Sequence, residues 1–303
     1  MLSLHTNAAS LSAQNALSGT QRSLSTTQTR LGTGFRINSA MDDAAGLQIA
    51  TRMKAQTSGM AVAMRNTQNA ISMMQTAEGA FNEVSAVLIR MKDLATQSAD
   101  GSSTTTDRTA MQAEYDALGL ELRNIMTNTS FNGQKLLTGA DTGNVNIAAA
   151  TAGTLGGSVT FQIGAVAAET MTVKFDTTLG TLNTAINAAS QRYATATTAN
   201  TGTDIAGTTG TAANAKIDLL NTALDAVGTV RAELGASSNR LDHVFNNLAN
   251  ISTNTQAAMG RIMDVDYAAE TSNMTTQQML MQAGTAMLKQ SNGMSSMVLS
   301  LLQ

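Results

Sequence analysis

A long periodic stripe of small and apolar residues constrains the fold of this chain more than any other feature. Between residues 60 and 95 such residues recur at alternating steps of three and four, and only one of them is polar. A stripe that persists over five heptads is typical of a helix packed as in a coiled coil, and its 36 residues would extend roughly 54 Å. The stripe consists of Met60, Ala63, Thr67, Ala70, Met74, Ala77, Phe81, Val84, Leu88, Met91 and Ala95.

A second, shorter stripe follows a polar interruption. Residues 98–107 are polar, with Gly101 as a helix stop and Thr106 or Asp107 as the N-cap of the next helix. The spacing then resumes at Met111, Tyr115, Leu118, Leu122 and Ile125 and ends before Asn132-Gly133. Two helices joined by so short a connection are expected to be antiparallel.

A third stripe lies far downstream, between residues 213 and 248, and continues to Val265 after a small slip in phase. Two polar residues, Arg231 and Ser238, interrupt it, and we expect them at the edges of a bundle. Its other members are Ala213, Ile217, Leu220, Leu224, Val227, Leu234, Leu241, Phe245 and Leu248.

Both ends of the chain carry a narrower version of this pattern. Their apolar positions are flanked by Ser, Thr, Gln and Asn, so neither terminal helix is expected to be stable alone. Each end needs the other, or further copies of the chain. The N-terminal positions are Leu4, Leu11, Leu17, Leu24 and Leu31, and the C-terminal ones are Leu280, Ala283, Met287, Met294, Met297 and Leu301.

The middle of the chain, residues 139–210, has a different composition. Glycine and alanine separate short alternating segments, which favours a few β-strands at 145–147, 159–163 and 171–175. Residues 181–199 are compatible with a helix, and the Thr/Gly/Ala-rich residues 197–215 with a loop or a poorly ordered linker.

The segments are expected to pair in a nested order. The outermost segments pair with each other, the next segments inward pair with each other, and the middle of the chain is an insertion. The predicted fold is mainly α: a long antiparallel helical bundle or coiled-coil rod with paired N- and C-terminal helices and a small β-containing insertion. We expect three parts: residues 1–43 with 255–303 as paired terminal helices, 44–138 with 211–254 as a helical rod, and 139–210 as a surface-exposed variable region.

Composition excludes several classes of function. The chain has no Cys and two His, which leaves no thiolate metal site, and no cofactor is expected. A net charge of −3 with 13% charged residues argues against nucleic acid as a partner. Without about 18 consecutive apolar residues, membrane insertion is not expected. The N-terminus has no cationic start and no apolar block, so we expect export by a route that does not cleave it.

Two pairs of aspartates, Asp42-Asp43 and Asp264/Asp266, are the only candidates for acid–base or metal chemistry. They lack an accompanying His or Glu at suitable spacing, so an enzyme is not expected. We expect these carboxylates to cap helices or to pair with Arg36 and Arg52. Seven of the 19 methionines fall on these stripes, and the methionines are interpreted as packing residues.

Several long motifs, in order along the chain, are similar to those of bacterial flagellins, the subunits of flagellar filaments. They are GTGFRINSAMDDAAGLQIA from Gly32, EGAFNEVSAVLIRMKDLATQSA from Glu78, SFNGQKLL from Ser130, ELGASSNRLDHVFNNL from Glu233, RIMDVDYAAETSNMTTQQMLMQAGTAMLK from Arg261, and VLSLL near the end. The similarity covers about the first 138 and the last 90 residues. Three departures are His5, the terminal Gln303, and GMSSM where the family often has a proline.

The resemblance implies a structural subunit that is exported unfolded by the flagellar type III apparatus and polymerises in the extracellular flagellum. Its implied partners are other copies of itself, filament cap and hook-junction proteins, and a cytoplasmic export chaperone on the C-terminal segment. Besides the terminal leucines and Met287, it assigns self-assembly to the N-terminal signature at Arg36, Asn38, Asp42 and Asp43. In many flagellins the rod helices also bind Toll-like receptor 5, and the matching positions are Arg90, Asp93, Leu94 and Glu114.

Two other functions remain open on the sequence. A hook–filament junction protein would share the terminal helices and the export route but would cap a filament; the intact RINSAMDDAAG at Arg36 favours a flagellin. A secreted helical effector or adhesin would explain the heptads, but it would not explain matching motifs at both ends.

Overall fold

The computed structural model describes residues 7–138, 153–194 and 202–301, with side chains as far as 293. It is mainly helical and divides into two compact units, residues 1–58 with 252–303 and residues 59–251. The boundaries between units fall inside two long helices, α2 (Ala44–Ala99) and α6 (Thr211–Met263). The three-part division predicted from the sequence stays a prediction.

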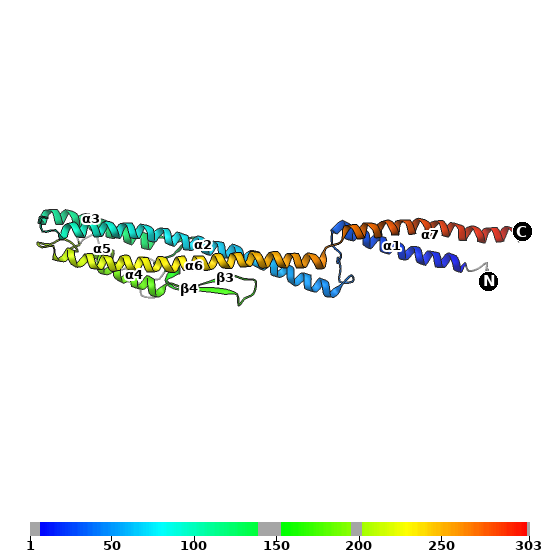
Figure 1. The fold of residues 1–303 in the computed structure, drawn as a ribbon, viewed down its shortest axis with the longest axis horizontal. Helices are drawn as coiled ribbons and strands as arrows, with labels where there is room; N and C mark the ends of the chain where they lie inside the picture. Colours follow the sequence, from blue (N-terminus) through cyan, green and yellow to red (C-terminus); the bar gives the residue numbers. More distant parts are fainter. Residues whose placement is uncertain (1–6, 139–152, 195–201, 302–303) are drawn as a thin grey trace. The chain divides into compact units, whose positions relative to one another are not determined.

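The terminal unit contains a pair of helices from opposite ends of the chain, α1 (Ala8–Thr33) and α7 (Tyr267–Leu301). Figure 1 shows them side by side, in blue and in orange to red. Hydrogen bonds from Asn7 to Ser291 and an ion pair from Arg30 to Glu270 make the pair antiparallel. The predicted pairing of the two ends is confirmed. The chain contains no proline, which leaves the backbone hydrogen bonds of such long helices uninterrupted.

The second unit is a bundle in which α2, α6 and α3 (Thr105–Asn128) lie alongside one another (Figure 1). All eleven members of the stripe at residues 60–95 are buried, none more than 3% exposed, so this prediction is confirmed. Thr67, the polar member, donates its hydroxyl proton to the Ala63 carbonyl at 2.8 Å, which satisfies it inside the bundle. Arg231 lies at the bundle edge as expected, 3.8 Å from Glu78.

Two helix boundaries differ from the prediction. α2 begins at Ala44, sixteen residues before the regular stripe, and the buried or half-buried Ala50, Met53 and Thr57 continue the spacing of the stripe toward its start. The N-cap of α3 is Thr104, neither Thr106 nor Asp107. Thr104 accepts from the Asp107 N–H at 3.2 Å while the Asp107 carboxylate accepts from the Thr104 N–H at 3.0 Å, and this reciprocal capping box fixes the start one turn earlier.

Two short antiparallel hairpins belong to this unit. The first joins β1 (Ser130–Phe131) to β2 (Gln134–Lys135), and its turn places Asn132 and Gly133 at φ 50° and 78°, a conformation those residues adopt readily. The second pairs β3 (Ser158–Gln162) with β4 (Thr170–Lys174), with Val159 opposite Val173. It confirms the predicted strands at 159–163 and 171–175; the one at 145–147 lies outside the described residues.

The described remainder of the insertion, within residues 153–194, contains more helix than the sequence suggested. A short 3-10 helix (Thr154–Gly156) precedes β3, and two helices follow β4, α4 (Asp176–Ala189) and α5 (Gln191–Ala194). The predicted helix at 181–199 was therefore placed too late. Its end is set at Ser190, whose extended backbone breaks the helix.

Residues 202–210, predicted as a loop or a poorly ordered linker, form a loop that is packed into the bundle, with Asp204 and Ile205 buried. Gln112 of α3 accepts from the Ile205 and Ala206 N–H groups at 2.6 and 3.0 Å, and Asp116 accepts from the Gly202 N–H at 2.8 Å. Composition was misleading here because buried side chains of α3 replace the hydrogen bonds that a regular element would supply.

Candidate self-assembly site

The helix pair at the chain ends is held by polar contacts along its length. Asn7 caps α1 by accepting from the Ser10 N–H at 3.1 Å, and its amide donates to the Ser291 carbonyl at 3.4 Å. The Ser10 hydroxyl donates to Asn292 Oδ1 at 3.2 Å. These contacts fix the register of α1 on α7, but most of them are partly exposed to water, where a hydrogen bond contributes little net stability.

Three of the predicted N-terminal leucines lie on the α7-facing side of α1. Leu24 is buried, Leu17 and Leu31 are half-buried, and Leu17 Cδ1 lies beside the backbone of Gly284. Leu11 is 51% exposed and does not belong to this seam, and Leu4 lies outside the described residues. The N-terminal stripe therefore serves the pair from Leu17 onward.

The described members of the C-terminal stripe, Leu280, Ala283 and Met287, do not face α1; the side chains of Met294 and Met297 lie outside the described ones. Leu280 and Met287 are 52% and 68% exposed, whereas the seam with α1 is formed by a different heptad frame. α7 therefore has two rows of apolar residues at heptad spacing, which we call frames. The row predicted from the sequence is the one that stays exposed in the monomer. Leu301 ends α7, and its side chain lies outside the described ones. Among the described side chains of α7, up to residue 293, those at least partly buried are Glu270, Met274, Gln277, Met281, Gly284, Leu288 and Ser291.

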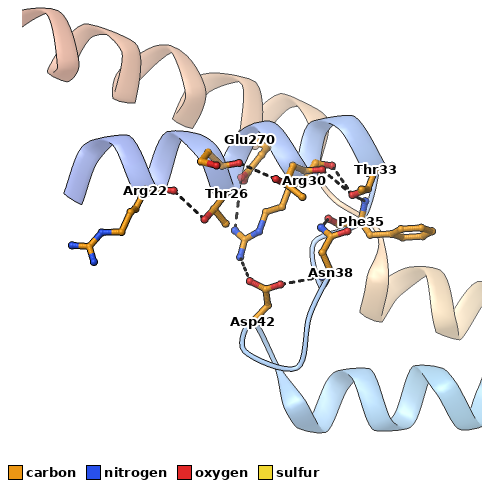
Figure 2. Close-up of polar contacts among 10 residues, drawn as sticks. Arg22, Thr26, Arg30, Thr33, Phe35, Asn38, Asp42 and Glu270 are labelled. Atoms are coloured by element: carbon orange, nitrogen blue, oxygen red, sulfur yellow. Dashed lines mark hydrogen bonds and ion pairs between the residues drawn. The ribbon is translucent and has the colours of Figure 1, made fainter. Parts of the chain in front are cut away.

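A folded turn connects α1 to α2 and carries the N-terminal signature. α1 ends at Gly34, whose φ of 77° is left-handed and whose N–H donates to the Arg30 carbonyl at 2.9 Å. The Asn38 amide donates to the Phe35 carbonyl at 2.8 Å, and Asp42 accepts from the Asn38 and Ser39 N–H groups at 3.1 and 2.9 Å. Figure 2 shows Asp42 closing this turn beneath the end of α1.

Arg30 links the turn to both terminal helices. Its guanidinium lies 3.9 Å from Asp42 and 3.7 Å from Glu270 of α7, and Figure 2 shows it between the two carboxylates. The hydrogen bonds from the Asn38 and Ser39 N–H groups, with a smaller contribution from Arg30, lower the pKa of Asp42. Asp42 therefore stays charged where the turn needs its acceptor oxygens.

The second aspartate of the signature begins the next helix. Asp43 accepts from the Gly46 N–H at 2.8 Å, as an N-cap does, and Ile37 is buried against this first turn. A Cβ on Gly46 would lie 2.7 Å from Ile37 Cδ1, so a larger residue there would force the Ile37 side chain to shift. Asp266 likewise caps α7 by accepting from the Ala268 N–H at 2.9 Å. The capping role expected of these carboxylates is confirmed for Asp43 and Asp266.

Among the described residues, the expected ion pairs of the aspartates with Arg36 and Arg52 do not form. Arg36 donates instead to the Ile262 carbonyl at 3.0 Å, and its backbone N–H donates to the Met263 carbonyl at 2.6 Å. The guanidinium that pairs with Asp42 belongs instead to Arg30, one helical turn before Gly34. The sequence analysis missed Arg30 and Glu270, since no local pattern relates residues so far apart.

The expected receptor positions lie in the second unit, on α2 and α3. Arg90 donates to Glu114 Oε1 through Nε and a terminal nitrogen, at 2.8 and 2.6 Å, and Asp93 is exposed on the same helix. Leu94 is buried in the bundle core and offers no surface of its own. The structure thus brings Arg90 and Glu114 together, while receptor recognition stays a prediction.

Neither a metal centre nor a membrane span is found in the described part of the chain. No group of three His, Asp or Glu side chains there could hold a metal ion. No described helix is both long enough and apolar enough to cross a bilayer. In the terminal unit, Asp43 and Asp266 cap helices, and Asp42 and Glu270 pair with Arg30.

Comparison with known proteins agrees with this arrangement of the two ends. The bacterial flagellin N-terminal helical region matches residues 4–142, and the C-terminal helical region matches 217–302. The chain is 37% identical to polar flagellin F of Vibrio parahaemolyticus over 99% of both chains, and 36% identical to flagellin A of Vibrio anguillarum over the full length of both. Flagellin B of Vibrio cholerae is 34% identical over 99% of both chains. The chain belongs to the bacterial flagellin family.

Proposed function

We propose that the chain is the structural subunit of a bacterial flagellar filament and that it polymerises through its terminal helices. The observation that carries this proposal is the second apolar frame of α7, with Leu280 and Met287 more than half exposed beside a seam already closed by α1. Exposed apolar side chains in one row favour burial against another molecule. In a filament subunit the molecule that covers them is another copy of the chain.

The finer features of this function follow from family membership. We propose that the protein is not an enzyme, leaves the cell unfolded through the flagellar type III apparatus and resides in the extracellular flagellum. The partners would be filament cap and hook-junction proteins and a cytoplasmic chaperone on the C-terminal segment, with Toll-like receptor 5 in animal hosts. The matched families and the relatives named above are flagellins, which favours a filament subunit over a hook–filament junction protein.

A marginally stable helix pair suits both export and assembly. α1 and α7 share a thin seam that includes Thr27, Gln277 and Gly284, so little apolar area opposes its opening. A pair of this kind can be unfolded for passage through a narrow channel. It gains stability when further copies cover its exposed frame, because binding to the ordered state alone shifts the equilibrium toward it.

Seeded polymerisation observed by electron microscopy tests the proposal. Intact protein is expected to extend filament seeds into long tubes, and protein lacking residues 1–43 and 255–303 is expected not to. Leu280→Asp should slow or stop growth by placing a charge in the exposed frame, whereas Val166→Asp, at a similarly exposed apolar residue of the β3–β4 hairpin, should leave growth unchanged. Intact protein that stays monomeric on seeds would contradict the proposal.

A further inference from the structure

The turn that joins α1 to α2 displays one apolar side chain to solvent. Met41 is 95% exposed, although the residues around it are tightly hydrogen-bonded. The Asp42 carboxylate accepts from the Ser39 hydroxyl at 3.1 Å in addition to two backbone N–H groups, and the Asp42 N–H donates to the Ser39 carbonyl at 3.1 Å. The backbone that carries Met41 is thus held in a fixed turn, and a backbone that is already ordered loses less entropy on binding.

The same unit contains an apolar pocket of about 330 Å³. It lies where the first turns of α2 meet the last turns of α6, and the Phe35 ring forms part of its lining. The backbone beside it is fixed, because the Val265 N–H donates to the Gly34 carbonyl at 3.0 Å and Phe35 pairs with Asp264 as an isolated bridge. Its apolar lining includes Leu47, Ala50, Met259 and Met263.

We propose that this pocket receives Met41 of a second copy of the chain; the inference rests on the proposed function. Met41 is almost fully exposed, so it does not fill the pocket of its own molecule. The pocket is apolar and large enough for a flexible thioether side chain, which adapts well to irregular cavities. When a protruding side chain and its pocket lie on different parts of the same molecule, copies associate head to tail. Such a contact builds an open helical polymer, unless the rotation between copies closes into a ring.

Charges around the two surfaces favour the same pairing. Met41 is followed by Asp42 and Asp43, and the pocket is lined at its edge by Lys54, whose side chain is exposed. Asp264 also lines the pocket, so the arriving turn must place its carboxylates on the Lys54 side. Opposite charges at such a rim contribute to orientation and to the rate of association more than to affinity.

Cross-linking tests the contact directly, because the natural chain has no cysteine. The variant Met41→Cys with Thr51→Cys places one thiol on the turn and one at the pocket. After filament growth and treatment with a short bismaleimide, denaturing gels are expected to show a ladder of covalent multimers. Filaments of either single-cysteine variant should yield monomers, as should the control Val166→Cys with Thr51→Cys.

The outcomes separate this contact from the proposed function. Filaments of the double variant that yield only monomers, or a ladder that stops at the dimer, overturn the contact and leave the filament subunit standing. Failure of the natural protein to grow filaments would overturn the proposed function itself, and the contact with it.

A second measurement covers the case in which the double variant does not assemble. Met41→Ala removes the side chain without a new charge and is expected to raise the critical concentration for growth on the order of tenfold, from the apolar area it no longer buries. Val166→Ala, the matched control, should leave that concentration unchanged. Equal critical concentrations for the natural protein and Met41→Ala would overturn the proposal.

Discussion

The two units of this chain bury their apolar side chains to different degrees. In residues 59–251, Phe81, Leu88 and Leu122 are completely buried among the bundle helices. In the terminal unit Leu24 is buried, while Leu280 and Met287 of α7 are mostly exposed. Both regions carry heptad patterns, so periodicity alone does not distinguish a fully buried core from one that leaves apolar side chains exposed. What distinguishes them is how many faces of each helix find a partner within one chain.

The largest expected change in the free energy of unfolding comes from the fully buried core of residues 59–251. Phe81→Ala should lower the free energy of unfolding of the 59–251 unit by about 3–5 kcal/mol, through lost burial and the cavity left behind. Thermal unfolding followed by circular dichroism measures it, with Val166→Ala expected to stay within about 0.5 kcal/mol of the natural protein. Equal melting temperatures for both variants would show that this unit is not a packed core.

The buried polar network of the same unit should contribute somewhat less. Gln112→Ala leaves the Ile205 and Ala206 N–H groups without their acceptor, and each stranded group costs about 1–3 kcal/mol. Urea denaturation should show a loss of at least about 2 kcal/mol. Gln68→Ala, at an exposed position of α2, is the control. A loss no greater than that of Gln68→Ala would mean that residues 202–210 are held by other contacts.

In the pair of α1 and α7, a comparable side-chain truncation should lower the stability by a smaller amount. Leu24→Ala is expected to destabilise the pair by about 1–2 kcal/mol, below the range for a surrounded core leucine, since only α7 packs on it. Faster amide exchange in α1 of the monomer is the measurement, and unfolding of the 59–251 unit should not change. Leu11→Ala, at an exposed position, should change neither. If Leu24→Ala instead lowered the melting temperature of the whole protein, the two units would not be independent.

The smallest effect is the response of two capping carboxylates to acid. The pKa of Asp42 is lowered chiefly by the Asn38 N–H, and that of Asp107 in the second unit chiefly by the Thr104 hydroxyl. Each contribution to stability is complete above the ordinary value of 3.8 and is lost as the pH falls through the lower folded-state pKa.

Carboxyl NMR titration of the monomer should therefore place both transitions below 3.8. Thr104→Ala is expected to raise the pKa of Asp107 and leave that of Asp42 unchanged. A transition of Asp42 at or above its ordinary value would mean that the turn presenting Met41 is not closed in solution.

Sequence periodicity predicted the helices well because each buried face repeats within its own helix. The stripe from Met60 to Ala95 was confirmed residue by residue, and so was the pairing of the two ends, although Leu280 and Met287 of the C-terminal stripe do not belong to its seam. What could not be predicted depends on contacts between distant segments. The ion pair of Arg30 with Glu270 and the hydrogen bonds of Gln112 to residues 205 and 206 have no local signature.

The α7 stripe shows how a correct pattern can be assigned to the wrong face. Leu280 and Met287 form the more apolar frame, whereas the frame that packs on α1 contains Gln277 and Gly284. The prediction chose the face of α7 by its hydrophobicity, but two helices that approach closely also favour small residues such as Gly284 at their contact. A frame that is apolar and yet unburied in the monomer is the one available to other copies.

Hydrogen exchange by mass spectrometry, on monomer and on filament, tests the central claim most directly: the terminal pair is completed only by assembly. We predict that α1 and α7 exchange within seconds in the monomer and become strongly protected in the filament, while α3 and the buried part of α2 are protected in both. Protection of α1 and α7 in the monomer equal to that of α3, or filaments in which they stay unprotected, would contradict the account.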